Sequence, residues 1–266
     1  MMKLLNLSIL LFTIIIFGCE KIDVIETNLP YEEKVVVQGL LEGYQVFQGV
    51  TFTKTLPLIE TFTIEKAELK DVVCYIKDGV RVIPLKYSSK GVYKPLINLQ
   101  IEGNKEYELF GKWKDRNVYA KTFVPSNPGV TNVFLIDDGT TAYIKGEVFN
   151  KPGQVYGATW AVYENNLLIK EAEEMYALSK ESDKENEKLQ LRTITIPRDI
   201  INTFKGKLYI RVYSFDEKFR DYFKTKKFNQ PIEDTFTQAG GNIEWNVYGD
   251  GIGMFLGIGR SLVLAK

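Results

Sequence analysis

Histidine is absent from the 266 residues of this chain. Its absence excludes Ser-His-Asp and Cys-His catalytic sites, histidine zinc ligands and a histidine general base. Hydrolysis by two carboxylates, as in glycosidases, stays open because it needs only a pair of Asp or Glu side chains across a cleft. We therefore expect no catalytic residue, no metal and no cofactor, with a carboxylate-based hydrolase as a remote alternative.

Cysteine is scarce, and the chain has no net charge. If Cys19 is chemically modified, Cys74 has no partner, so no intrachain disulfide is expected, and the apolar neighbours of Cys74 predict a small buried residue. The 34 basic residues balance the 34 acidic ones. A nucleic-acid binder would need a basic face, so we expect no nucleic-acid partner.

The chain also lacks nucleotide-binding motifs. The glycines between Tyr248 and Gly259 do not fit the dinucleotide fingerprint, and no Walker pattern is present. We interpret these glycines as a glycine-lined turn, followed by a closing strand at Leu262–Ala265.

An apolar run long enough to cross a bilayer comfortably is missing. The longest run, Leu4–Phe17, has about 14 residues and reaches roughly 21 Å as a helix, whereas a span needs about 20 residues. Its length, together with Lys3 before it, predicts a signal peptide over residues 1–18. A membrane helix and a signal peptide with an incidental cysteine are the alternatives.

The residues that end this run, Ile16-Phe17-Gly18-Cys19, resemble the lipobox of bacterial lipoproteins. The resemblance implies a mature chain that begins at Cys19 and carries a thioether-linked diacylglycerol and an amide-linked acyl chain such as palmitate. Two or more acyl chains anchor a protein stably to a membrane. Residues 19–30 then form a flexible tether. Its acidic residues either help to route the protein to the cell exterior or simply solvate the linker.

Short strands separated by turn residues dominate residues 31–125. About seven strands are expected there, the size of an immunoglobulin-like β-sandwich. They are Glu33–Leu41, Val46–Thr55, Ala67–Lys77, Val80–Leu85, Val92–Tyr93, Lys105–Trp113 and Val118–Val124. The prolines and the glycine of Pro125–Gly129 cannot continue a strand and predict a domain boundary.

Residues 126–266 are expected to form a second β-rich domain with short helices. The expected strands are Val133–Ile136, Thr141–Phe149, Ala158–Tyr163, Leu191–Ile196 and Lys207–Phe215. Pro197 and Asp216 predict the helices Arg198–Lys205 and Asp216–Lys227. Glu171–Lys188, rich in Glu, Lys and Ser, predicts an exposed, partly disordered excursion or a frayed helix.

Aromatic residues make up 13% of the chain. They suit the packing of β-sheets, and they also suit a platform on which sugar rings stack. On the second interpretation, the candidate ligand-binding residues are Trp113, Trp160 and Trp245.

Three segments are similar to a known family: EKVVVQGLL (Glu33–Leu41), LYIRVYSFDEKFRDYF (Leu208–Phe223) and NIEWNVYGDGIGMFLG (Asn242–Gly257). They resemble the Bacteroidetes lipoproteins called domain of unknown function 4249, which commonly end in Asn-Ile followed by Gly-Ile-Gly-x-Phe-x-Gly. Here Glu244–Tyr248 depart from the usual spacing between the two pieces. The resemblance implies an outer-membrane lipoprotein, often associated with TonB-dependent transporters, and it carries over no catalytic residue.

These observations favour a lipid-anchored, non-catalytic accessory protein of the outer membrane. Its expected partners are the membrane, a TonB-dependent transporter and a glycan or peptide ligand that it helps to capture or admit. The alternative is a stand-alone surface module that binds glycans.

Overall fold

The computed structural model describes residues 31–178, 184–203, 205–219, 231–232 and 246–265. The chain divides into two compact units, Met1–Glu32 and Glu33–Lys266. The expected signal peptide and the whole tether, including Cys19, lie outside the described residues, so the fold below is that of the second unit. Among the described residues, no helix is long and apolar enough to cross a membrane.

The prediction of a mainly β chain with short helices is confirmed. The described helices are α2 (Ile64–Ala67), α3 (Arg198–Thr203) and the 3-10 helix η1 (Glu217–Phe219). Helix α3 lies where a helix was expected after Pro197. Within the second predicted helix, Asp216–Lys227, Asp216 ends β14 and η1 covers Glu217–Phe219, while residues 220–227 lie outside the described residues.

Seven strands occupy the first half of the second unit, as the turn spacing predicted. Along β1 and β7 every second residue is buried, so each strand has one face in the core and one face outward. The seven strands are β1 (Val35–Glu42), β2 (Val50–Lys54), β3 (Val73–Asp78), β4 (Arg81–Ser89), β5 (Val92–Pro95), β6 (Lys105–Trp113) and β7 (Arg116–Val124). The predicted start of the third strand, Ala67, is wrong, because that residue ends α2.

The described residues of the second half form ten strands: β8 (Val130–Asp137), β9 (Ala142–Phe149), β10 (Gln154–Glu164), β11 (Leu167–Glu171), β12 (Met175–Ala177), β13 (Lys188–Arg192), β14 (Lys207–Asp216), β15 (Pro231–Ile232), β16 (Val247–Gly249) and β17 (Gly251–Leu264). The expectation of an excursion or frayed helix over Glu171–Lys188 is wrong for β12, which pairs with β10. Met175 explains the strand, since its side chain is buried against Phe215 and other apolar residues. Residues 179–183 lie outside the described residues.

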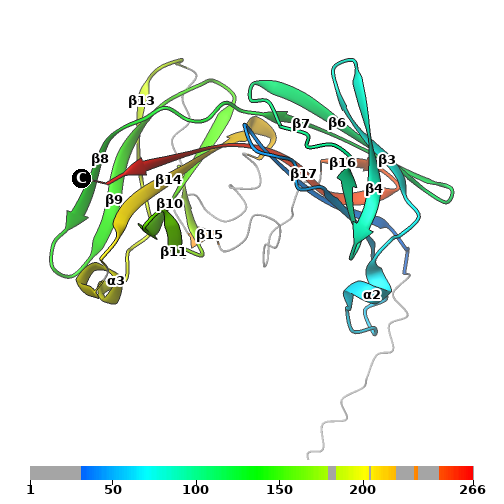
Figure 1. The fold of residues 1–266 in the computed structure, drawn as a ribbon, viewed down its shortest axis with the longest axis horizontal. Coiled ribbons are helices and arrows are strands. Elements are labelled where there is room, and N and C mark those ends of the chain that lie inside the picture. Colours follow the sequence, from blue (N-terminus) through cyan, green and yellow to red (C-terminus); the bar gives the residue numbers. More distant parts are fainter. Residues whose placement is uncertain (1–30, 179–183, 204, 220–230, 233–245, 266) are drawn as a thin grey trace, which may run out of the picture. The chain divides into compact units, whose positions relative to one another are not determined.

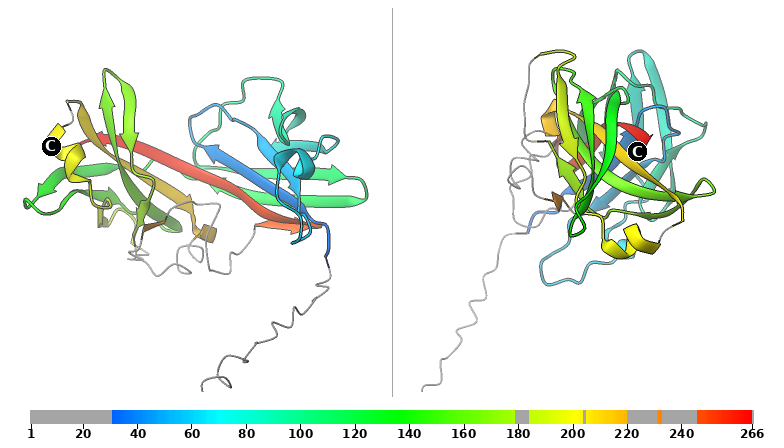
Figure 2. Two further views of the ribbon diagram at one scale, coloured as in Figure 1. Left: turned by 90° about the horizontal axis from the view of Figure 1, so that it is seen from below. Right: turned by 90° about the vertical axis from the view of Figure 1, so that its left-hand side faces the viewer.

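The last strand, β17, ties the two halves together. It pairs in parallel with β1 from Gly251 to Ile258 and then antiparallel with β14 from Ile258 to Leu264. Figures 1 and 2 show it, in red, running from the blue β1 to the yellow β14. The expected glycine-lined turn is therefore limited to Gly249, which ends β16, and the prediction is wrong for Gly251, Gly253, Gly257 and Gly259, which lie within the one continuous strand β17.

Most strands belong to one hydrogen-bonded path, and a small second sheet packs beside it. The path runs β15-β12-β10-β14-β17-β1-β2-β5-β4-β3-β6-β7-β16, with β11 attached to β10, and the second sheet is β13-β9-β8. Strand β7 also lies close to β17 without pairing with it, although several strands separate the two along the path. The sheet therefore curves back on itself and encloses a core. That core contains buried residues from β1 to β7 and from the returning β16 and β17.

The predicted boundary at Pro125–Gly129 separates two cores along the chain, but the chain crosses it again. The first core draws on residues 35–124 together with Val247 and Phe255, and the second on residues 133–212. The linker itself is held in place: Ser214 Oγ donates to the Ser126 carbonyl oxygen at 3.0 Å. The two halves therefore share β17 and cannot be divided at one point of the sequence.

Cys74 is buried in the first core, as its apolar neighbours predicted. Burial raises the pKa of its thiol to about 12. The thiol therefore stays protonated at neutral pH, and a protonated, buried thiol is a poor nucleophile.

Candidate ligand-binding site

Of the three tryptophans proposed as a sugar platform, the two that the structure describes do not offer exposed rings. Trp113 is 5% exposed, its Nε1 donates to Asp71 Oδ1 at 2.9 Å, and the Lys114 ammonium lies 4.2 Å from its ring centroid. Trp160 is 3% exposed and belongs to the second core. The prediction is wrong for these two residues, because a ring needs an open face to stack on a sugar. Trp245 lies outside the described residues.

The buried carboxylates of the described part hold the fold together. Asp78 forms ion pairs with Arg81 and with Lys105, whose Nζ lies 3.4 Å from Asp78 Oδ1. Asp216 Oδ2 accepts a hydrogen bond of 3.1 Å from the Phe123 backbone N–H. Within the ranges that the structure describes, no three His, Cys, Asp or Glu residues gather as a metal site would require.

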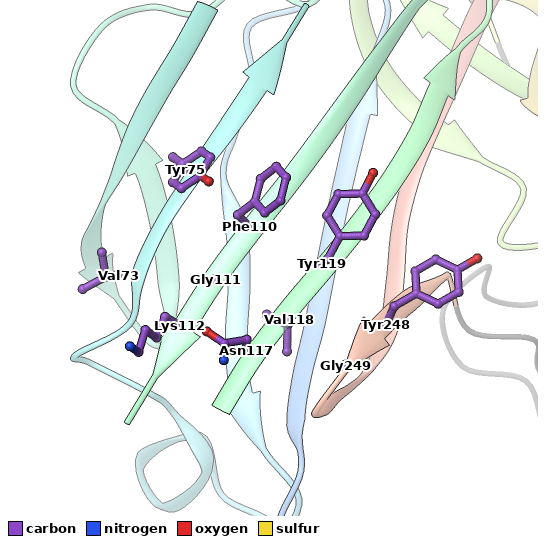
Figure 3. A pocket seen from close by; sticks show the side chains of 10 residues that line it. All are labelled: Val73, Tyr75, Phe110, Gly111, Lys112, Asn117, Val118, Tyr119, Tyr248 and Gly249. Carbon is purple, nitrogen blue, oxygen red and sulfur yellow. The ribbon is translucent and has the colours of Figure 1, made fainter. Parts of the chain in front are cut away.

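A row of four aromatic rings crosses the outer face of the first half (Figure 3). The rings belong to β3, β6, β7 and β16, which are neighbours in the sheet. Their centroids follow one another at 4.9, 4.9 and 6.4 Å. We call this set the aromatic row: Tyr75, Phe110, Tyr119 and Tyr248.

Strand register produces the aromatic row. Tyr75 lies directly opposite Phe110, Phe110 opposite Tyr119, and Tyr119 opposite Tyr248. Directly opposed residues on one face of a sheet lie close enough for their side chains to touch, so each ring contacts the next. Aromatic pairs of this kind contribute about 0.5 to 1.5 kcal/mol beyond the area they bury.

The four rings of the aromatic row lie at strand positions whose side chains point away from the core. In β6 the core side chains are Tyr107, Leu109 and Trp113, so Phe110 points away from the core. An apolar ring at an outward position costs free energy unless something covers it. Neighbouring rings cover one another in part, and Tyr248, at the end of the row, remains 55% exposed.

The end of the row is fixed by the turn between β16 and β17. The Asp250 backbone N–H donates to the Asn117 carbonyl oxygen and Asp250 Oδ2 accepts from the Asn117 N–H, both at 2.9 Å. Gly249 makes this approach possible. It has φ +87°, and a β-carbon there would lie 2.4 Å from the Asn117 oxygen. The turn therefore holds Tyr248 beside Tyr119 on the edge of β7.

The aromatic row lines a shallow hollow of about 420 Å³ that polar groups flank. Lys112 and Asn117 line one side. On the other side, Glu108 pairs with Lys77 at 3.7 Å and lies opposite Lys121 in the sheet. The hollow thus combines flat apolar surfaces with hydrogen-bonding groups at their margins.

The hydroxyl of Tyr119 is available as a hydrogen-bond donor at neutral pH. Burial raises its pKa, and the negative charge of Glu108 acts in the same direction. A protonated phenol both donates and accepts hydrogen bonds. The aromatic row therefore combines apolar ring surfaces with a hydroxyl group that can donate and accept hydrogen bonds.

The aromatic row was not predicted, although part of its signal is in the sequence. Phe110 and Tyr119 each fall between inward-facing residues of an alternating strand, which marks them as outward rings. Nothing local predicts that β3 pairs with β6 or that β16 returns to β7.

No protein-family model matches the chain, and no curated protein matches it at a significant level.

Proposed function

We propose that this chain is a non-catalytic, lipid-anchored binding protein of the bacterial outer membrane that captures a glycan on the aromatic row. The aromatic row is the observation that carries the proposal. The lipobox-like residues ending at Cys19 and the resemblance to the domain of unknown function 4249 support the location, and the resemblance supports a TonB-dependent transporter as the partner that receives the ligand.

A glycan suits the aromatic row because of its mixed surface. Sugar rings have flat faces rich in C–H groups, which pack on aromatic rings, and hydroxyls at their edges, which need hydrogen-bond partners. The row offers rings on four adjacent strands with Lys112 and Asn117 beside them. Successive rings across neighbouring strands favour an extended chain of sugars over a single one.

Replacing Tyr248 with alanine should weaken glycan binding without disturbing the fold. Tyr248 is 55% exposed and ends the row, so its ring can be removed without opening the core. Loss of one stacking ring should cost about 1 to 2 kcal/mol of binding free energy, or about tenfold in Kd. Titration calorimetry with soluble polysaccharides that a glycan array identifies would measure the change.

Phe134→Ala is the matched control, since Phe134 is 48% exposed on β8 and lies outside the row. It should leave Kd unchanged. Should the array show no glycan bound by the wild-type chain, or should Tyr248→Ala and Phe134→Ala have equal effects, the proposed ligand site would be rejected.

Co-purification separates the accessory role from a stand-alone glycan-binding module. The full lipidated chain would be affinity-purified from outer membranes solubilised in mild detergent. An accessory protein should bring an outer-membrane transporter with it in a fixed ratio. A stand-alone module should bind glycan equally well but bring no transporter.

A further inference from the structure

We infer that the loop of residues 57–62 is a second membrane contact, whose apolar side chains enter the bilayer in addition to the lipid anchor. The inference rests on the lipid anchor in the proposed function. We call residues 57–62 the apolar loop; its apolar side chains are Leu58, Ile59 and Phe62. It follows β2 and leads into α2, away from the aromatic row in the sequence.

The apolar loop places its most hydrophobic residues at a turn. The Glu60 backbone N–H donates to the Pro57 carbonyl oxygen at 2.9 Å, which puts Leu58 and Ile59 at the two central positions. These side chains are 86% and 96% exposed, and Phe62 is 65% exposed. The turn thus has a fixed shape and presents three large apolar side chains to its surroundings.

Such a turn is unusual for a surface in contact with water only. Central turn positions favour Gly, Pro, Asn, Asp and Ser, each for a backbone reason that Leu and Ile do not share. Grouped exposed apolar side chains mark a protein or membrane contact. Lys66 Nζ lies 3.7 Å from Glu60 Oε2, so the one charge within the turn is paired.

The chain enters the folded unit next to Lys54 and Thr55, just before the apolar loop, and this position favours the bilayer as the occupant. The Lys34 backbone N–H donates to Thr55 Oγ1 at 2.9 Å, and Lys54 forms an ion pair with Glu33 at 3.1 Å. The polypeptide that leads back to Cys19 therefore joins the unit at the end of β2, from which the apolar loop extends. Figure 1 shows the start of β1 next to the segment around α2.

Two membrane contacts on one side would fix an orientation that acyl chains alone leave free. Apolar side chains that enter the headgroup region add binding in proportion to their buried apolar area. A tether attached at a single residue allows the folded unit to rotate. Insertion of the apolar loop would instead hold one end of the unit at the membrane surface.

A thiol-attached, environment-sensitive fluorophore at position 59 tests the inference. Ile59→Cys would be labelled in the full lipidated chain, in which Cys19 is blocked by lipid and Cys74 is buried. Val80→Cys is the matched control. Val80 is also 96% exposed, and it lies in the turn after β3, outside the apolar loop. Both proteins would be placed in vesicles of phosphatidylethanolamine and phosphatidylglycerol, and quenching by iodide would be measured.

We expect the label at position 59 to shift its emission to the blue and to be quenched severalfold less than the label at position 80. Equal quenching of the two labels in protein that floats with the vesicles would overturn the inference and leave the lipid anchor intact. Protein that does not float would overturn the anchor and the inference with it. Protection at position 59 that rises with protein rather than lipid concentration would identify a second copy as the occupant and overturn the inference.

Discussion

Gly257→Ala should destabilise the protein by about 3 kcal/mol, or prevent folding altogether, because overpacking a close backbone contact is among the costliest small changes. A β-carbon at Gly257 would lie 2.3 Å from the Phe123 carbonyl oxygen and 2.9 Å from the Val124 α-carbon. Both are backbone atoms of the segment that crosses β17, so neither can rotate away. The Gly257 N–H also donates to Thr122 Oγ1 at 2.9 Å, which any shift of β17 would break.

Gly146→Ala is the matched control for this change. Gly146 lies in the middle of β9, and the nearest atoms to its β-carbon would be side-chain methyl groups at 3.5 Å and beyond. An ordinary contact of that kind should change the free energy of unfolding by less than about 1 kcal/mol. Urea unfolding followed by circular dichroism would compare the two variants, and equal midpoints would show that β17 does not depend on the crossing at Gly257.

Cys19→Ser should move the protein from the membrane fraction to the soluble fraction. If Cys19 carries the proposed lipid, a serine hydroxyl cannot replace its thiol in the thioether to diacylglycerol, so every acyl chain would be lost. Each buried methylene contributes about 0.8 kcal/mol to membrane binding, far more in total than the apolar loop could supply alone. Fractionation of cells that express the full chain, followed by immunoblotting, measures the distribution.

Cys74→Ala serves as the control for Cys19→Ser, because it removes the other cysteine and leaves the proposed lipid site at Cys19. It should remain in the membrane fraction, since Cys74 is buried in the first core and has no part in anchoring. A Cys19→Ser protein that stays with the membrane in the wild-type amount would contradict the anchor.

Alternation and turn residues were sufficient to predict most strands. In the first half, β1, β6 and β7 alternate buried residues with more exposed ones, and turn residues separate most of the seven strands, so their positions could be predicted. The same logic failed for β17, where glycine suggested a turn. There the requirement is space, because a β-carbon at Gly257 would lie 2.3 Å from the Phe123 carbonyl oxygen, and one at Gly259 would lie 2.4 Å from the Ser126 carbonyl oxygen.

Long-range pairing is what local patterns could not supply. The expected boundary at Pro125–Gly129 uses local residues alone, whereas the parallel pairing of β17 with β1 joins residues more than two hundred positions apart. The aromatic row also depends on long-range pairing, since Tyr248 lies opposite Tyr119 only because β16 pairs with β7. Choosing tryptophans by residue type selected two core side chains, because a large ring fills a core as readily as it binds a sugar.

Hydroxyl-radical footprinting with a bound glycan tests most directly whether the aromatic row is the ligand-binding surface. The full chain would be oxidised with and without saturating glycan, and the oxidation of each ring would be measured by mass spectrometry. We predict that Tyr248 and Tyr119 lose reactivity in the complex while Tyr44 and Phe134, both exposed outside the row, keep theirs. Unchanged reactivity along the row, with protection appearing elsewhere, would contradict the account.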